Sequence, residues 1–336
     1  MIIDKKKLSN YIHKLSDIKI LVVGDIAIDE MVYGDTERIS REAPVLILQH
    51  TQTKILLGAA SNAAHNASTI NNGKVSVIGV VGDDYQAEQL REAFENANIN
   101  HEYLVVEKGR KTVTKTRISG SCSQSITQQI VRIDRQTNDV ISKETEDKII
   151  ENLEKAILQV DAVILSDYHI GVLTNRIIEK TTELAKNYNK IVVADAQKDL
   201  ANYKNVTSMT PNLPDTQKFF NKVLKSNEEI AESGKKIIDM VNAKAMLITC
   251  GADGMVSVNS DGTYDVIPVF NKAKVFDVTG AGDTVTALYT MGLATGAEPL
   301  YAAIIGNIAA SIVVKQFGCA TTTISELIET LNKLDI

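Results

Sequence analysis

Short apolar runs rich in β-branched residues alternate with amphipathic segments along most of this chain, and this alternation restricts the fold more than any other feature. Each run is short enough for one buried strand, and they span 18–24, 74–82, 162–166, 190–195 and 245–251. Helical spacing of apolar residues occurs between them, at 60–70, 85–96, 143–159, 174–187 and 226–241. Further helices are expected from Ala281, Pro299 and Ser325. The pattern predicts an α/β fold with a mostly parallel central sheet and helices on both faces.

Two segments depart from this rhythm. Residues 30–53 and 111–135 alternate polar and apolar side chains without a helical period, which is typical of antiparallel strands with one solvated face. We expect them to form one small sheet that projects from the core as a lid. Without repeats or Pro/Gly-rich linkers, the chain reads as a single domain over 1–336, with its core in three parts: 17–29, 54–110 and 136–336.

Composition restricts where such a protein works. The 336 residues are 44% hydrophobic and carry a net charge of −6, which suits a globular protein and argues against a nucleic-acid or membrane-surface role. Cys122, Cys250 and Cys319 are too far apart for a disulfide framework or a zinc site. The longest apolar stretch, Ala302–Val314, falls short of the roughly 20 residues of a membrane span, and the N-terminus lacks a secretory signal. We therefore expect a cytoplasmic protein.

The string DVTGAGDTVTALYTMGLATG at 277–296 carries the strongest chemical signal. Gly280, Ala281 and Gly282 have almost no side-chain bulk and precede a helical pattern, so backbone N–H groups at a helix N-terminus would be open to an anion. Asp283, in the first turn, would lie beside a bound phosphate and accept a proton from a hydroxyl, as phosphoryl transfer requires. A glycine turn capped by Asp283 is the more common arrangement for such a string.

Other nucleotide and hydrolase motifs are missing from the sequence. There is no G-x-x-x-x-G-K-[ST] loop and no G-x-G-x-x-G after the first strand, and Val285 stands where a third glycine would follow Gly282. A G-x-S-x-G elbow is also absent. These observations argue against a P-loop enzyme, a dinucleotide-binding protein and a serine hydrolase.

The string D-V-T-G-A-G-D resembles the C-terminal signature of the ribokinase-like (PfkB) family of carbohydrate kinases. The resemblance implies the three-layer fold of that family. It also implies that Asp283 is the catalytic base and that Gly280, Ala281 and Gly282 form an anion hole.

The sugar site of this family also has counterparts here. LGAASNAAHNAS at 57–68 resembles the N-terminal signature, with Gly58 and Asn62 at sugar-contacting positions and Ala59 in place of the usual second glycine. GDIAID at 24–29 resembles the element whose last residue, Asp29, grips sugar hydroxyls, since a carboxylate can accept two hydroxyl donors. Taken alone, Asp29 would more often be a solvated loop residue.

The nucleotide and cation sites follow from the same resemblance. TPNLPD at 210–215 resembles the family's N-x-x-E element, with Asp215 in the acidic position, and implies that Asp215 holds Mg²⁺ through a water. A helix start capped by Asn212 explains the string equally well. The other implied nucleotide residues are Asn212, Thr249, Gly251, Gly254 and Asn307, all for ATP. Asp277 and Thr279, with the loop around Gly318, resemble a monovalent cation site suited to K⁺.

The resemblance covers about 18–331 and is nearest to the heptose 7-phosphate kinase branch. It is carried by 34–48, 114–119, 128–134, 166–174 and 277–285. This branch implies ATP-dependent phosphorylation of O1 of D-glycero-D-manno-heptose 7-phosphate to the 1,7-bisphosphate. In bifunctional relatives a nucleotidyltransferase domain follows, whereas this sequence ends at Ile336. DAQK at 195–198 and GSCSQS at 120–125 depart from the branch pattern.

A phosphorylated sugar needs cationic donors at its far end, and the expected lid contains several. Lys115, Arg117 and Arg132 are predicted to bind substrate, with Arg38 and Arg41 as further candidates. A solvated charged face explains any one of them as well. The alternative functions are a kinase for ribose, fructose or adenosine, and a sugar or nucleotide sensor without catalysis. Exposed lid edges favour a homodimer formed through the lids.

Overall fold

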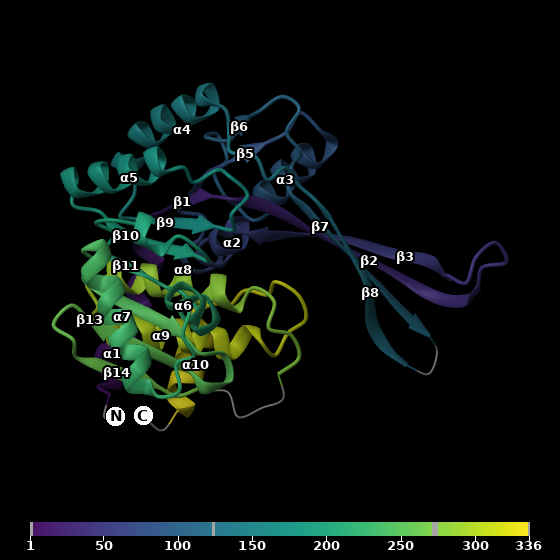
Figure 1. The fold of residues 1–336 in the computed structure, drawn as a ribbon. Helices are drawn as coiled ribbons and strands as arrows, with labels where there is room; N and C mark the ends of the chain where they lie inside the picture. The colour runs from purple at the N-terminus through teal and green to yellow at the C-terminus, as the bar shows by residue number, and fades with distance from the viewer. Residues whose placement is uncertain (1–2, 123–124, 271–274, 335–336) are drawn as a thin grey trace.

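The computed structural model describes residues 3–122, 125–270 and 275–334, and Figure 1 shows a layered core from which one long sheet extends. The central sheet has five parallel strands in the order β11-β10-β9-β1-β4. They are β1 (Ile20–Gly24), β4 (Val75–Ile78), β9 (Ala162–Asp167), β10 (Ile191–Ala196) and β11 (Ser208–Met209). The prediction of parallel strands at 18–24, 162–166 and 190–195 is confirmed.

Helices cover both faces of this sheet because its side chains are apolar on both sides. Ile20 and Val22 of β1 belong to one core cluster, and Leu21 and Val23 belong to the other. The first cluster is closed by α1 (Lys5–Lys14), α2 (Ala60–Asn71), α3 (Tyr85–Asn96), α8 (Ala281–Ala294), α9 (Pro299–Val313) and α10 (Ile324–Lys333). The second is closed by α4 (Lys143–Ala156), α5 (Asn175–Asn187) and α7 (Asn227–Val241). The three-layer α/β fold is confirmed.

One apolar run was assigned to the wrong sheet, and a second lies in the central sheet only in its first half, β4. The run 245–251 forms β12 (Ala245–Thr249), which pairs antiparallel with β13 (Met255–Asn259), and β13 pairs with β14 (Tyr264–Ile267). The run 74–82 divides at Gly79, after which β5 (Val80–Val81) pairs with β6 (Val105–Val106). An apolar run indicates burial, but it carries no information about the direction of the neighbouring strand.

The projecting sheet consists of β2 (Ile26–Ile39), β3 (Leu46–Ala59), β7 (Thr114–Cys122) and β8 (Ser125–Arg135), in the order β3-β2-β7-β8. Residues 123–124 of the GSCSQS segment lie outside the described residues. The expectation of purely antiparallel strands is wrong in the middle of the sheet, where β2 and β7 are parallel. Both strands leave the core and run outward, so they must point the same way (Figure 1).

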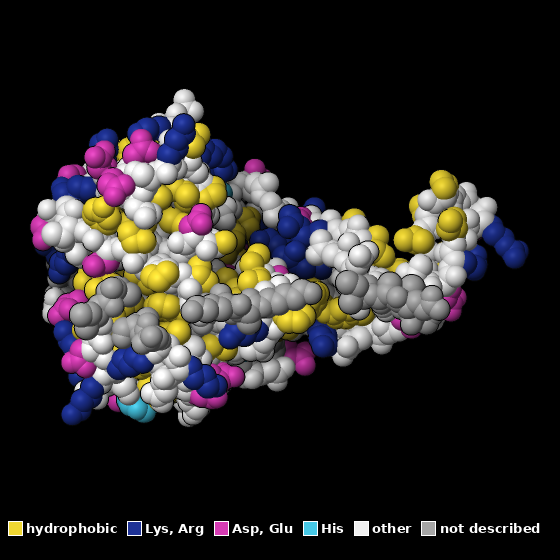
Figure 2. Space-filling model, turned by 90° about the horizontal axis from the view of Figure 1, so that it is seen from below, with side chains coloured by type: hydrophobic (Ala, Val, Ile, Leu, Met, Phe, Trp, Pro, Cys, Tyr) yellow, Lys and Arg dark blue, Asp and Glu magenta, His cyan; other side chains and the backbone are white. Residues whose placement is uncertain are grey.

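The sheet changes character along its length. β2 is buried from Ile26 to Asp29 and exposed from Glu37 to Ile39. Figure 2 shows the outer part standing clear of the core, with apolar side chains toward its tip. Across the residues that the structure describes, no helix has the length and apolar character of a membrane span. The buried root of the projecting sheet lies at the carboxyl ends of the central strands, where open α/β sheets bind ligands.

Candidate active site

The start of α8 has the geometry that its glycines predict. Gly280 caps the helix with a φ of +76°, and a Cβ there would lie 2.3 Å from Asn62 Nδ2, so a side chain would be excluded. No side chain caps this helix end. The alternative that Asp283 serves only as the N-terminal cap is therefore wrong. The Ala281 N–H donates to the Val278 carbonyl at 3.2 Å, whereas the N–H groups of Gly280 and Gly282 have no partner among the described residues and are open to a ligand.

Asp283 is almost fully buried but hydrogen-bonded through both carboxylate oxygens. The Tyr168 hydroxyl donates to Oδ1 at 2.6 Å, and Asn62 Nδ2 donates to Oδ2 at 2.8 Å. Burial raises the pKa of Asp283 to about 6, while these two hydrogen bonds and the charge of Lys115 oppose the rise. Such a carboxylate is ionised at neutral pH and is a stronger base than a solvated one. Lone pairs remain on both oxygens for a further hydroxyl donor.

A cavity of about 210 Å³, which we call the charged cavity, lies between the projecting sheet and the loops around α8 and α9. Asp29 is 5% exposed, and its Oδ1 lies 3.5 Å from Arg117 Nη2. The Cys319 thiol donates to Asp29 Oδ2 at 3.5 Å. A Cβ at position 58 would lie 2.9 Å from the same oxygen, so Gly58 makes room for this carboxylate.

Arg117 has spare hydrogen-bonding capacity. Its Nε is buried without a partner among the described residues, although the guanidinium lines the charged cavity. A buried donor of this kind costs free energy until it finds an acceptor. An anionic or hydroxylated ligand in the charged cavity would supply that acceptor.

Asp277 joins two loops at the floor of the charged cavity. Its Oδ1 accepts the Thr279 N–H at 2.9 Å, and its Oδ2 accepts the Gly318 N–H at 3.0 Å. The three residues that the sequence grouped as a monovalent cation site therefore lie together. Whether an ion binds them stays a prediction.

A larger cavity of about 680 Å³, the apolar cavity, opens at the start of α8. Its walls include Gly282 and Val285 of α8 together with Met255 and Val269. It contains all but one of the predicted nucleotide residues: Asn212, Thr249, Gly251, Gly254 and Asn307. Its size and apolar lining suit a ligand with a flat heterocycle and a polar tail directed at the start of α8.

The exception is Asp215, which does not line the apolar cavity. It lies in the first turn of α6 (Leu213–Phe220), where Asn212 Oδ1 accepts its N–H at 2.7 Å. Asn212 thus caps the helix and also faces the cavity, so its two interpretations are compatible. Burial raises the pKa of the Asp215 carboxyl.

The predicted basic residues of the projecting sheet divide into two groups. Lys115 places its Nζ 4.9 Å from the centre of the Tyr168 ring, and Arg117 reaches Asp29, so both face the site. Arg132 pairs instead with Asp134, with Nε and Nη2 at 2.8 and 3.0 Å from its oxygens, and is half-exposed. Arg38 and Arg41 are exposed. The structure therefore brings together Lys115 and Arg117 but not the others.

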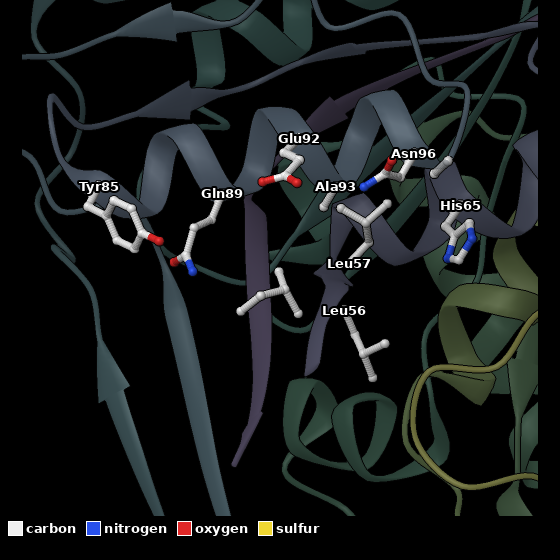
Figure 3. Close-up of a pocket in the computed structure, with 10 residues that line it drawn as sticks. Leu56, Leu57, His65, Tyr85, Gln89, Glu92, Ala93 and Asn96 are labelled. Carbon is white, nitrogen blue, oxygen red and sulfur yellow. The ribbon is translucent and has the colours of Figure 1, made fainter. Parts of the chain in front are cut away.

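A third cavity, of about 300 Å³, lies at the root of β3 beside α2 and α3 (Figure 3). Figure 3 shows His65, Glu92 and Asn96 around it. Leu56 lines both this cavity and the charged cavity. None of the residues predicted for catalysis or binding lines the third cavity, so we do not assign it to the active site.

Sequence reasoning missed Tyr168 and Asp25. Tyr168 follows β9 and Asp25 follows β1, and the carboxyl ends of these strands meet at the same edge of the sheet. The signal that was available is their position directly after a buried parallel strand. Asn62 Nδ2 donates to Asp283 Oδ2 at 2.8 Å and to the Gly280 carbonyl at 3.3 Å, and its contact with a sugar stays a prediction.

Comparisons with solved structures agree with this fold. Ribokinase from Arabidopsis thaliana, solved with ribose and ATP, superposes with a TM-score of 0.70 at 16% identity, covering 94% of this chain and 98% of that one. Phosphofructokinase-2 from Escherichia coli, solved with fructose-6-phosphate, gives a TM-score of 0.71 at 15% identity, covering 94% and 99%. At such identities the likeness concerns the fold alone.

Sequence comparison is more specific. Proteins named bifunctional protein HldE are similar to this chain: that of Desulfatibacillum aliphaticivorans is 36% identical over 313 residues, and that of Aliarcobacter butzleri is 36% identical over 311. These matches cover 93% and 92% of this chain but only 63% of each relative, so the chain spans less than two thirds of their length. The model of the pfkB family of carbohydrate kinases matches residues 17–326. This chain belongs to the pfkB family of carbohydrate kinases, enzymes that transfer a phosphoryl group to an alcohol oxygen.

Proposed function

We propose that this kinase transfers the γ-phosphoryl group of ATP to O1 of D-glycero-D-manno-heptose 7-phosphate and forms the 1,7-bisphosphate. The observation that carries the choice of a phosphorylated sugar is Arg117, a largely buried cation in the charged cavity whose Nε has no partner among the described residues. A hydroxyl of a neutral sugar would also accept from this group, but a phosphate oxygen would form a stronger, charge-assisted hydrogen bond with it. The similarity to proteins named HldE supports the heptose.

ATP would occupy the apolar cavity. The adenine would lie against its apolar walls near Asn307, whose Nδ2 donates to the Pro268 carbonyl at 2.8 Å. The terminal phosphates would meet the turn at Gly280, Ala281 and Gly282, where the N–H groups of the two glycines are open and the helix dipole favours negative charge. Thr249, Gly251 and Gly254 also line the apolar cavity and would contact ATP between its adenine and its terminal phosphates.

Magnesium would bind near the terminal phosphates. Asp215 would hold it through a water, because the carboxylate stands back from the cavity wall and Mg²⁺ commonly keeps several waters. When bound, the ion would offset negative charge on the phosphates. K⁺ would bind near Asp277 and Thr279, beside the anion hole. Neither assignment depends on the choice of sugar.

Asp283 would take the proton from the attacking sugar hydroxyl. Asp29, which lines the charged cavity, would accept hydrogen bonds from further sugar hydroxyls and so orient O1 toward the phosphoryl group. Gly58, which makes room for the Asp29 carboxylate, and Asn62, which donates to Asp283, would lie beside the bound sugar. Lys115, which lowers the pKa of Asp283, would add positive charge where the phosphoryl group passes.

The projecting sheet would act as a lid and as the dimer interface. Closure would bring Arg117 and Lys115 onto the substrate and exclude water from the reaction. Its exposed apolar side chains suit contact with a second copy of the chain: Ile39, Val45, Leu46, Ile130, Val131 and Ile133. Light scattering at micromolar concentration should give a dimer, and a monomeric mass would rule this interface out.

A substrate panel tests the proposed function. We expect ADP release with heptose 7-phosphate to exceed that with fructose 6-phosphate, ribose, fructose or adenosine, and phosphorus NMR should show a new anomeric phosphate. Faster turnover of an unphosphorylated sugar or a nucleoside would overturn the heptose assignment while leaving the kinase intact. Absence of ADP release with every acceptor would support a sensor.

A further inference from the structure

We propose that Tyr168 is a positioning residue for the reaction: its hydroxyl holds the Asp283 carboxylate, and Asp25 fixes the loop that carries it. This inference rests on the proposed role of Asp283 as the base. It adds two residues, from the loops after β9 and β1, to a site otherwise built on α8 and the projecting sheet.

The first step of the argument is the geometry around Asp283. Tyr168 donates to Oδ1 at 2.6 Å and Asn62 donates to Oδ2 at 2.8 Å. Distances of this size are typical of hydrogen bonds to an ionised carboxylate. The two donors come from separate elements, the loop after β9 and helix α2, so the carboxylate is held from two directions. A base fixed in this way presents its free lone pairs at one angle.

The second step is how Tyr168 is held. Asp25 is 1% exposed, and its carboxylate accepts three backbone N–H groups: Tyr168 at 2.8 Å, Ile170 at 3.1 Å and Val172 at 3.3 Å. The intervening His169 has a φ of +62°, which is uncommon for a residue with a side chain. The loop keeps this shape because a buried carboxylate gathers its amides. Asp25 therefore controls where the Tyr168 hydroxyl lies.

The third step concerns charge. The groups that act on Asp283 are Lys115 from β7, Asp29 from β2, Asp195 from β10, and Cys319 from the loop after α9. Burial raises the pKa of Tyr168 well above its ordinary value, so the phenol stays protonated and remains a donor at every pH of interest. Its hydrogen bond lowers the pKa of Asp283. Removing the phenol should therefore raise the pKa of the base.

The test is the pH dependence of kcat/KM in Tyr168→Phe. We expect the acidic limb to move up by about half to one pH unit, since a lost hydrogen bond disfavours the charged carboxylate. At pH 8 kcat should fall roughly tenfold, as expected for a poorly oriented base. The KM for ATP should stay unchanged. The matched control is Tyr289→Phe, which removes another fully buried phenol, one that hydrogen-bonds to the Ser208 hydroxyl at 2.9 Å and does not contact the Tyr168 loop. Its acidic limb should not move.

A second variant covers the case in which Tyr168→Phe fails to fold. Replacing Tyr168 by 3-fluorotyrosine keeps the hydroxyl and makes it a stronger donor, so the acidic limb should move to lower pH. An unmoved limb in the folded Tyr168→Phe protein, or an equal shift in Tyr289→Phe, would overturn the proposal. Asp283→Asn, assayed in parallel, separates the two hypotheses. Retained activity there removes Asp283 as the base, whereas an inactive Asp283→Asn with an unmoved Tyr168→Phe removes only the role of Tyr168.

Discussion

The two cavities that the segment just before α8 helps to line are built in different ways. The apolar cavity, about 680 Å³, has no charged side chain among its described lining residues and draws them all from 212–314. The charged cavity, about 210 Å³, combines Asp29, Arg117 and Asp277 from segments far apart in the chain. One is a feature of the core. The other exists only where the projecting sheet meets that core.

This difference indicates how the fold divides its tasks. The apolar cavity is held by packed helices and strands, so its shape depends little on the projecting sheet. The charged cavity depends on β2, β7 and β8, whose outer parts are exposed. Changes in the projecting sheet can therefore alter the acceptor without disturbing the nucleotide site. Substitutions on the two sides should change different kinetic constants.

Asp283→Asn should have the largest effect on activity, because Asp283 is the proposed base. It should lower kcat rather than weaken the binding of either substrate. An amide cannot take the proton, so kcat should fall by about 10²- to 10⁴-fold. Both hydrogen bonds can be remade, since the amide oxygen accepts from Asn62 and the amide nitrogen donates to the Tyr168 oxygen. Calorimetry should show unchanged ATP binding. Activity within a few-fold of wild type would remove Asp283 from the mechanism.

Arg117→Ala should come next and act on the charged cavity alone. Losing a charge-assisted hydrogen bond of about 1.5 to 3 kcal/mol should raise the KM for the sugar phosphate roughly 10- to 100-fold. The KM for ATP should hardly change. Arg132→Ala is the matched control, because Arg132 lies directly opposite Arg117 across the strand pair yet pairs with Asp134. Equal rises in KM for the two variants would contradict the division described above.

Ala310→Leu tests the other side. Ala310 of α9 lines the apolar cavity, and the added carbon atoms would take space from the nucleotide. We expect the KM for ATP to rise about tenfold, as for a few misfitting methylenes, with the KM for the sugar unchanged. A similar rise in both constants would show that the two cavities do not act independently.

The layered core was predictable because burial leaves a repeating pattern in sequence. The runs at β1, β9 and β10 are apolar except toward their carboxyl ends, as a sheet covered on both faces requires, and the helices between them show their apolar stripe. The antiparallel pairing of β12 was not predictable in this way. The same residues would be buried beside a partner of either direction, so the pattern could not distinguish the two.

The site was only partly predictable, for a related reason. Motif position indicated Asp29 and Asp283, but Asp25 stands in the same GDIAID string and no local feature distinguishes a loop-holding carboxylate from a sugar-facing one. Tyr168 is a single aromatic residue in a loop. Its role depends on a contact with a residue 115 positions away. Such contacts follow from the fold and not from any spacing along the chain.

The smallest effect concerns stability. Burial raises the pKa of Asp283 from its ordinary 3.8 to about 6, so between these pH values the unfolded chain loses this proton while the folded protein keeps it. Stability therefore falls as pH rises through this window, and the cost persists above it. Asp283→Asn should be more stable than wild type by about 1 to 3 kcal/mol at pH 7.5, given 1.36 kcal/mol per pKa unit. At pH 5 the difference in stability between the two proteins should shrink by about half.

The pKa values of buried Asp25 and Asp195 are raised in the same way, but both proteins contain these residues, so their effects largely cancel in the comparison. Urea denaturation at the two pH values measures the difference in the free energy of unfolding. A gain in stability that does not depend on pH would show that burial does not raise the pKa of Asp283.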